Sequence, residues 1–289
     1  MTYQITPAEI EEYQTRGFIH LRQVLDNEWL KVLSKAVERV ELEGKQQPRV
    51  MNMTKLRRRL DSEAGRETLQ PASNYIIAHN AWRWNDTLEH IAFNSPLPAL
   101  AAELMGASQI TWYFDQVFIK PPGSLLRTEF HQDLGYWTCK GEQICTFWAP
   151  TDPVRLQNGA MGYVPGSHRW DENFKANMFV GQQPIPGQEG DDLPDIAANE
   201  HHFGVDYIEC EPGDVIVHHV KTIHGSAGNM TADAPRRSIA FRYTGDDVVY
   251  RTLPGLPPDS TPVSDTLKDG DPLESDLFPR IWTQVDANS

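Results

Sequence analysis

The chain has 289 residues, of which 39% are hydrophobic and 10% aromatic, and its formal net charge at pH 7 is −14. This composition can bury a full core, and the acidic balance argues against nucleic acid or an anionic membrane as the main partner. No run approaches the roughly 18 apolar residues of a membrane span, and the N-terminus MTYQITPAEIEEY is too polar for a targeting peptide. We therefore expect a soluble, cytoplasmic protein.

Helix signals dominate the N-terminal third of the chain. A capping box with proline at the first helical position, Thr6–Glu9, predicts a helix that stops near Gly17. A short strand, Phe18–Leu21, should follow. Asp26–Gly44 then shows apolar residues at helical spacing, which predicts an amphipathic helix.

Two further segments complete this part of the chain. Ser95 as cap, followed by Pro96, predicts another helix that ends at Gly106. The charged segment Lys55–Glu67 breaks periodicity, and its ordinary interpretation is a solvated loop. The sharper alternative is a lid that contacts an anionic substrate.

From Ile110 the chain changes to short β-prone segments separated by glycine and proline. These segments are ITWYFDQVFIK, QICTFWAP, GAMGYVPGS, DYIECEPGDVIVHHV and RRSIAFRYTG. Such spacing favours an antiparallel sandwich or barrel, and no Rossmann or P-loop fingerprint is present. We predict a single α+β domain over residues 1–289: a mainly helical part (1–109), a double-stranded β-helix or jelly-roll core (110–250) and an irregular tail (251–289).

The three cysteines, Cys139, Cys145 and Cys210, form no CxxC pair and leave an odd residue. Neither a disulfide framework nor a thiolate metal cage is indicated. We expect all three to be reduced core residues.

The stretch FHQDLGYW, Phe130–Trp137, sets a histidine and an aspartate two residues apart among apolar neighbours. If it is a strand, His131 and Asp133 share one face and Gln132 points the other way. A divalent metal would compensate an ionised Asp133 in this setting. The pattern alone is not specific, because a surface loop or a hydrogen-bonded core histidine accounts for most such pairs.

A third ligand is required, and several histidines are candidates: His168, His201, His202, His218, His219 and His224. Only His224 lies in a segment with further chemistry, since Ser226 and two arginines follow it. With His131 and Asp133 it would form the 2-His-1-carboxylate set of non-haem Fe(II) oxygenases. His218 and His219 are the main rivals, and strand alternation would send one of them inward to a core or supporting role.

Arginine pairs carboxylates bidentately, so one of Arg236 and Arg237 is expected to bind the diacid cosubstrate 2-oxoglutarate. In a strand only one of the two can face inward. Burial alone favours Arg237, whose same-face neighbours are apolar. Arg236 has the small same-face neighbours Ser238 and Ala240, which would leave room for a ligand.

Five segments of the chain resemble the phytanoyl-CoA dioxygenase family of Fe(II)/2-oxoglutarate oxygenases. They are FHQDLGYW, CTFWAPTDP, NGAMGYVPGSHRW, EPGDVIVHHVKTIHGSAGN and PRRSIAFRY, and with EEYQTRGFIHLRQVL and YFDQVFIKPPG the resemblance covers roughly residues 8 to 250. It implies Fe(II) as cofactor and 2-oxoglutarate and O2 as cosubstrates. The implied reaction hydroxylates an unactivated C–H of a small metabolite and releases succinate and CO2. Asp133 disfavours halogenation, because related halogenases replace this carboxylate with a small residue.

The resemblance also implies roles for single positions. His131, Asp133 and His224 resemble the iron ligands. Arg236 is similar to the arginine that pairs with the distal 2-oxoglutarate carboxylate, and Ser226 resembles its hydroxyl partner.

Three more positions are implied less directly. Trp148 is expected to line the same pocket, and Gln116 and Lys120 share a face of the preceding strand as candidates for cosubstrate contacts. Ordinary strand packing is the alternative for Gln116 and Lys120. Tyr136 and Trp137 either wall the substrate site or belong to the core.

Two other classes stay open at this stage: a metal-dependent cupin-like isomerase or hydrolase, and a non-catalytic jelly-roll binding protein. The favoured substrate is a small polar or amphipathic metabolite. A bulky polyanion such as an acyl-CoA would require four arginines to gather at the mouth of the site: Arg57, Arg58, Arg59 and Arg66. The sequence does not separate hydroxylation from desaturation or epoxidation.

Overall fold

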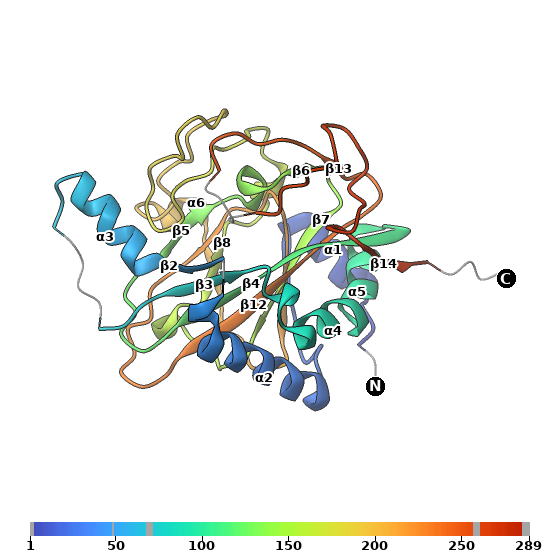
Figure 1. The fold of residues 1–289 in the computed structure, drawn as a ribbon, viewed down its shortest axis with the longest axis horizontal. Helices are drawn as coiled ribbons and strands as arrows, with labels where there is room; N and C mark the ends of the chain where they lie inside the picture. The colour runs from blue at the N-terminus through green and yellow to red at the C-terminus, as the bar shows by residue number, and fades with distance from the viewer. Residues whose placement is uncertain (1–2, 48, 68–71, 257–260, 285–289) are drawn as a thin grey trace.

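The computed structural model describes residues 3–47, 49–67, 72–256 and 261–284, and its centre is a sandwich of two antiparallel sheets (Figure 1). Within these residues the larger sheet has eight strands. Their order is β1 (Phe18–Leu21), β10 (Val215–His219), β7 (Ile144–Pro150), β12 (Arg236–Thr244), β4 (Gln109–Lys120), β3 (Ile76–His79) and β2 (Val50–Asn52), with β14 (Arg280–Thr283) paired to β4.

A smaller sheet lies against the larger one. Its order is β5 (Thr128–His131), β11 (His224–Ser226), β8 (Met161–Tyr163) and β9 (Asp206–Ile208), and a separate ribbon pairs β13 (Val249–Tyr250) with β6 (Cys139–Lys140). The two sheets form the predicted double-stranded β-helix, so the α+β fold class is confirmed.

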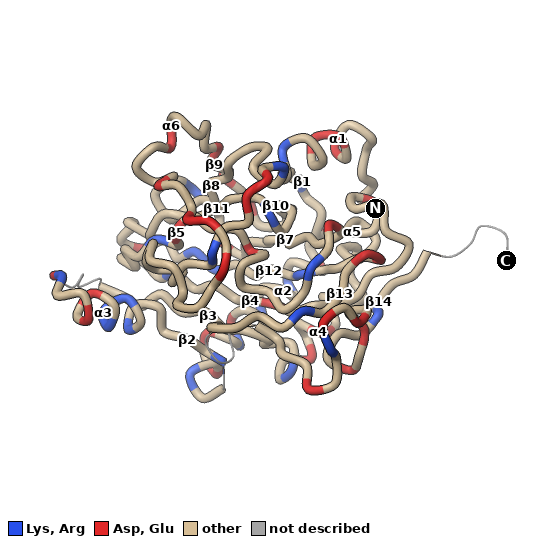
Figure 2. Tube along the Cα trace, turned by 90° about the horizontal axis from the view of Figure 1, so that it is seen from above, with Lys and Arg blue, Asp and Glu red and all other residues tan. Residues whose placement is uncertain are grey.

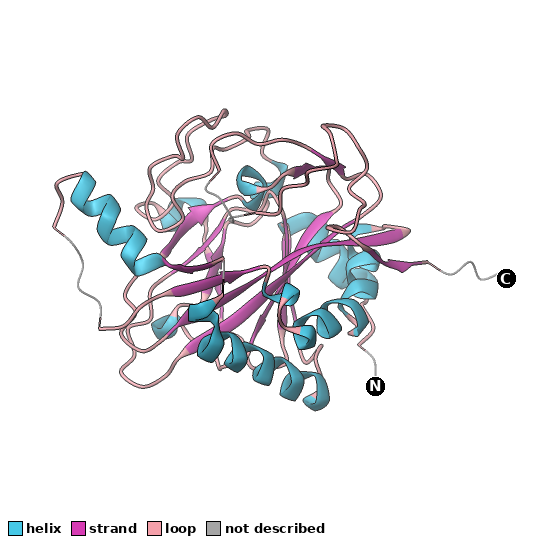
Figure 3. Cartoon of the chain, in the orientation of Figure 1, coloured by secondary structure: helices cyan, strands magenta, loops and turns pink. Residues whose placement is uncertain are grey.

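Helices cover the outer face of the larger sheet (Figure 3). The α-helices are α1 (Pro7–Arg16), α2 (Asn27–Glu43), α3 (Met53–Glu63), α4 (Asp86–Asn94), α5 (Leu97–Met105) and α6 (Glu200–Phe203). Single 3-10 turns are η1 (Gly44–Gln46), η2 (Ala81–Arg83), η3 (Asp133–Tyr136), η4 (Leu156–Asn158) and η5 (Ser167–Arg169). In the described part of the chain, no helix has both the length and the apolar character needed to cross a bilayer.

The predicted helix boundaries are confirmed at both ends of α1 and α2. Thr6 and Glu9 form the reciprocal capping box, and Gly17 closes α1 in the left-handed region with φ 80°. Asp26 caps α2 by accepting hydrogen bonds from two backbone N–H groups. Ser95 does not cap α5 in the predicted way: α5 begins after Pro96, while the Ser95 hydroxyl accepts a hydrogen bond from Leu97 N.

The prediction of a solvated loop over Lys55–Glu67 is wrong, because most of this segment forms α3. The Asn52 side chain caps the helix, and Arg57 bonds to the buried carboxylate of Asp61 one turn later. Figure 2 shows basic and acidic residues mixed along this helix at the edge of the molecule. Because many of its residues are charged, the pattern of hydrophobic residues does not reveal the helical period of this segment.

The sequence also missed several elements that extend the sheet and its helical cover. Strands β2 and β3 continue the larger sheet beyond β4, and α4 packs beside α2. The tail after Arg251 is not wholly irregular, since β14 pairs with β4. Residues 257–260 and 285–289 of that tail lie outside the described residues.

Strand β12 separates two environments through its alternating side chains. Ile239 and Phe241 belong to the apolar core that includes the helices on the outer face. Arg236, Ala240 and Arg242 point to the inner side and line a pocket between the sheets. The helical cover thus explains the apolar face of RRSIAFRY.

The cysteines are buried and free, as predicted. The prediction that one of the two adjacent histidines faces inward is also confirmed. His218 lines the inner pocket, whereas the His219 ring bonds to the carbonyl of Glu142 and accepts a hydrogen bond from Lys221 N.

Burial, followed by the nearby His168, lowers the pKa of His219 to about 4 from an ordinary 6.5. The unfolded chain therefore binds this proton before the folded protein does, and the free energy of unfolding should decrease as the pH falls from 6.5 towards 4. In His219→Gln, whose amide can keep both hydrogen bonds, the decrease should be shallower by up to about 1.4 kcal/mol per pH unit. Guanidinium unfolding at several pH values measures both slopes, and equal slopes would contradict the assignment.

Candidate active site

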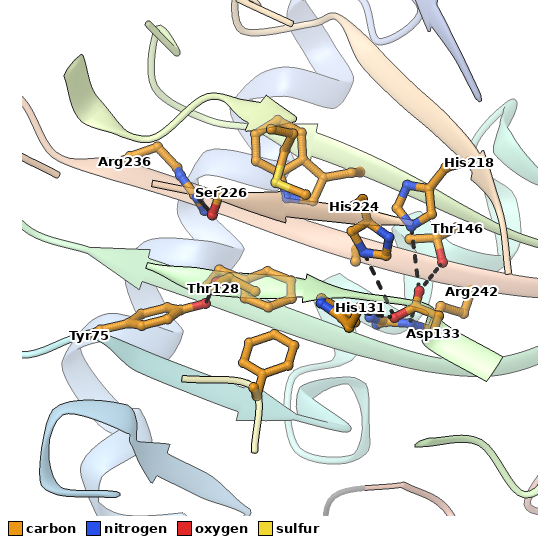
Figure 4. Close-up of a pocket in the computed structure, with 15 residues that line it drawn as sticks. Tyr75, Thr128, His131, Asp133, Thr146, His218, His224, Ser226, Arg236 and Arg242 are labelled. Atoms are coloured by element: carbon orange, nitrogen blue, oxygen red, sulfur yellow. Dashed lines mark hydrogen bonds and ion pairs between the residues drawn. The ribbon is translucent and has the colours of Figure 1, made fainter. Parts of the chain in front are cut away.

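Three potential metal ligands converge at one end of the inner pocket (Figure 4). One ligand atom from each of His131, Asp133 and His224 lies within 4.8 Å of the others, and all three residues are buried. His131 ends β5 and pairs directly with His224 at the start of β11, so the smaller sheet places both histidines. Asp133 is not on the same strand as His131, contrary to the prediction. It begins η3, and this turn brings its carboxylate to 3.6 Å from His131 Nε2.

Backbone carbonyls orient both imidazole rings. Nδ1 of His131 lies 2.7 Å from the carbonyl oxygen of Glu129, and Nδ1 of His224 lies 2.9 Å from that of Thr222. A proton on each Nδ1 leaves each Nε2 as a lone-pair donor, and both Nε2 atoms face Asp133. Two neutral imidazoles and one carboxylate suit a divalent metal with open coordination positions.

The charge of Asp133 is stabilised although its side chain is buried. Burial acts to raise its pKa, but the neighbouring His131 and His218 side chains and the charge of Arg242 hold that pKa well below its usual range. The Thr146 hydroxyl also donates to the carboxylate at 3.1 Å. The carboxylate is therefore ionised and fixed in place.

The opposite end of the pocket is defined by an arginine. Figure 4 shows Arg236 and Ser226 together, away from the three ligands. Arg236 is 1% exposed, and its guanidinium donates to the Ser226 hydroxyl at 3.0 Å and lies 5.5 Å from the Trp148 ring. Among the described residues its Nε has no hydrogen-bond partner. The pocket has an empty volume of about 380 Å³, and a buried cation at its end is suited to an anionic group.

The two weaker candidates on β4 lie in different places. Lys120 joins the arginine end, because its Nζ donates to Ser226 Oγ at 2.9 Å and lies 4.7 Å from the Tyr75 ring. Gln116 lies away from it, where its side chain accepts a hydrogen bond from Arg242 and donates to His79. Only Lys120 is therefore next to the Arg236 end.

Arg237 points out of the pocket. Its guanidinium pairs with Asp152 at 2.7 Å and with Glu41 of α2 at 3.3 Å. The structure thus separates the two adjacent arginines as strand alternation requires.

The sequence missed several residues that line this pocket. They are Tyr75, Phe118, Thr128, Thr146, Met161, Phe179 and Arg242. For Arg242 a signal existed, because it shares the strand face of Arg236 and Ala240. The other residues carry no chemical signal of their own in the sequence, and only the tertiary fold brings them together.

A second, larger cavity adjoins the first. It has an empty volume of about 860 Å³ and shares Asp133 and Phe179 with the smaller pocket. Tyr136 and Trp137 both line it, so these aromatics wall a cavity next to the candidate ligands.

The arginines of α3 and the following Arg66 do not form a cluster at the mouth of the larger cavity. Arg57 and Arg66 both pair with Asp61, and Arg59 pairs with Glu63. Of the four arginines named in the sequence, only Arg59 lines the cavity.

Comparison with known proteins agrees with this geometry. Residues 13–238 match the family Phytanoyl-CoA dioxygenase (PhyH). A probable phytanoyl-CoA dioxygenase of Caenorhabditis elegans is 31% identical over 142 residues, which cover 45% of this chain and 41% of the relative. A probable alpha-ketoglutarate-dependent hypophosphite dioxygenase of Stutzerimonas stutzeri is 25% identical over 164 residues, which cover 56% and 54%. The chain thus matches about half the length of these relatives.

The fold is similar to that of the epimerase SnoN, solved in complex with Fe3+, alpha ketoglutarate and nogalamycin RO. The TM-score is 0.69 at 21% identity, and the alignment covers 95% of this chain and 98% of SnoN. Fold, ligand geometry and family match together define a protein of the Fe(II)/2-oxoglutarate oxygenase superfamily. Within it, the chain belongs to the phytanoyl-CoA dioxygenase family.

The position of Arg237 outside the pocket predicts a purely structural role. Arg237→Ala should lower the free energy of unfolding by about 1 to 3 kcal/mol, because the buried Asp152 carboxylate loses its bidentate partner. Chemical denaturation measures the loss. The double variant with Asp152→Ala should lose less than the sum of the two single changes, and full additivity would contradict the pairing.

Proposed function

We propose that the protein is an Fe(II)- and 2-oxoglutarate-dependent dioxygenase that hydroxylates an unactivated C–H of a small metabolite, with release of succinate and CO2. The observation that carries the proposal is that one buried pocket has a three-ligand donor set at one end and the Arg236–Ser226 pair at the other. A short diacid can bridge two such ends, since its oxo acid group and its distal carboxylate face opposite ways. The proposal includes a cytoplasmic location.

Each role follows from the donor and acceptor groups that line the pocket. His131, Asp133 and His224 would hold the iron, and Arg236 with Ser226 would bind the distal carboxylate of 2-oxoglutarate. Bound iron supplies the activation of O2 that couples decarboxylation of the cosubstrate to oxidation of the substrate. The protein contributes orientation and a site from which bulk water is excluded.

Neighbouring residues would hold the metal ligands and the residues that bind the cosubstrate in position. Lys120 and Arg236 both donate to the Ser226 oxygen, so its lone pairs are occupied and its O–H would donate to an incoming carboxylate beside the guanidinium. Thr146 and His218 hold the second oxygen of Asp133, which leaves the first for a metal. The retained carboxylate favours oxygen transfer over halogenation.

The family match favours an oxygenase over a cupin-like isomerase or hydrolase and over a non-catalytic jelly roll. Structural neighbours include an epimerase and a carbocyclase, described as alpha ketoglutarate dependent. Product analysis by mass spectrometry, with ¹⁸O2 as the oxidant, therefore tests the hydroxylation directly. A product without added oxygen would reassign the reaction while leaving succinate formation intact.

The metal assignment predicts that each ligand is essential. His131→Ala, Asp133→Ala and His224→Ala should each abolish stoichiometric Fe(II) binding and succinate formation, because two remaining ligands cannot hold the ion in this geometry. Anaerobic Fe(II) titration with circular dichroism as a folding control measures the effect. His219→Gln is the matched histidine control and should bind iron normally, and iron binding retained in any ligand variant would displace that residue from the set.

The cosubstrate assignment separates the adjacent arginines. Arg236→Ala should weaken 2-oxoglutarate binding by about 2 to 5 kcal/mol, a rise in KM of roughly 30-fold to a few thousandfold, because a buried carboxylate loses a charged partner. Arg237→Ala is the control, and its KM should stay within about twofold. Steady-state succinate assays give both values. The reverse pattern would place the anchor at Arg237.

A further inference from the structure

The larger cavity has no role in binding iron or 2-oxoglutarate under the proposed function. It meets the smaller pocket at Asp133 and Phe179, so a molecule inside it would lie beside the candidate metal ligands without displacing Arg236. Its walls come from strands of the larger sheet, from α3 and from the segment 177–185. Arg57 fastens α3 to that segment by donating to the carbonyl of Val180 at 2.8 Å.

The wall is mainly apolar. The hydrocarbon and thioether side chains that form it are Met51, Met53, Leu56, Ile77, Phe114, Trp137, Met178, Phe179 and Ile185. Three of them are methionines, whose flexible side chains adapt to the shape of a bound molecule. The space between these walls, including the part that opens to solvent, has a volume of about 860 Å³.

The polar side chains on the wall already bond to one another. Asn177 donates to the carbonyl of Phe130, and its side-chain oxygen accepts from the Tyr136 hydroxyl at 2.7 Å and from Phe179 N at 2.8 Å. Gln116 is engaged by Arg242 and His79. The wall therefore presents few hydrogen-bonding groups to a ligand.

Charge on the cavity wall is confined to two positions among the described residues. Asp133 faces the candidate metal site. Arg59 is 67% exposed at its side chain and lies 3.7 Å from Glu63. A ligand with several negative charges would meet no set of buried cations here.

We propose that the larger cavity binds the primary substrate and that this substrate is an uncharged, mostly hydrocarbon small molecule. The inference rests on the proposed function for the chemistry that the substrate undergoes. It replaces the polar metabolite favoured from the sequence with an apolar one, and it disfavours acyl-CoA esters.

Two fluorescent probes with the same ring system test the selectivity of the cavity. N-phenyl-1-naphthylamine is uncharged, and 1-anilinonaphthalene-8-sulfonate adds one sulfonate to the same frame. The uncharged probe should bind the intact protein at least tenfold more tightly than the sulfonate. Equal or tighter binding of the sulfonate would overturn the proposal.

Substitutions locate the bound probe. Met178→Glu and Met51→Glu place a carboxylate at two half-buried positions from separate segments of the wall, and each should weaken the uncharged probe at least tenfold. Met230→Glu makes the same change at a methionine that is 67% exposed and outside the cavity, and it should leave the affinity within twofold. Thermal melting confirms that each variant is folded. Unchanged affinity in both folded cavity variants would overturn the proposal.

The same samples separate this inference from the proposed function. Fe(II) titration and succinate formation report the metal and cosubstrate sites, whereas probe binding needs neither. Loss of iron binding with normal probe selectivity would count against the oxygenase assignment alone. Normal iron and 2-oxoglutarate binding without probe selectivity would count against the apolar substrate alone.

Discussion

The buried negative charge of Asp133 is the constraint on which the site depends. A carboxylate that is 4% exposed stays ionised only if positive or hydrogen-donating groups surround it. Arg242 supplies the fixed positive charge, with its Nε 4.0 Å from an Asp133 oxygen, and it is itself buried over the Phe114 ring. The pairing of β12 with β4 and β7 holds this cation opposite the ligand set.

Strands β4 and β12 separate the helices on the outer face of the larger sheet from the candidate site on its inner face. The outer face of β12 packs under α2, α4 and α5, and this apolar core holds the backbone in place. The inner face can then carry Arg236 and Arg242, two buried cations that would destabilise an unsupported sheet. A rigid scaffold behind a polar face is what a site needs if it is to hold two small ligands in fixed relation.

Local rules predicted those parts of the fold that local chemistry determines. Capping residues located α1 and α2, and alternation in β12 assigned opposite faces to Arg236 and Arg237. The turn at Asp133 was missed because its cause is distant: Leu134 N bonds to the carbonyl of Val220. The helix α3 was missed because Arg57 and Asp61 obscure its apolar period. The place of Tyr75 in the pocket and the larger cavity itself form only when strands far apart in sequence pair, so no local sequence pattern predicts them.

The burial of the cysteines has a consequence for oxidative damage. Reaction with oxidants requires the thiolate, and burial raises the pKa of Cys139 and of Cys210 to about 12, so almost none is present at neutral pH. Under the proposed function, which brings Fe(II) and O2 together, the buried thiols would therefore react slowly with oxidants formed during uncoupled turnover. The methionine thioethers, by contrast, line both pockets next to the candidate metal ligands. Their conversion to sulfoxide would make an apolar surface polar, and methionine sulfoxide reductase reverses this change.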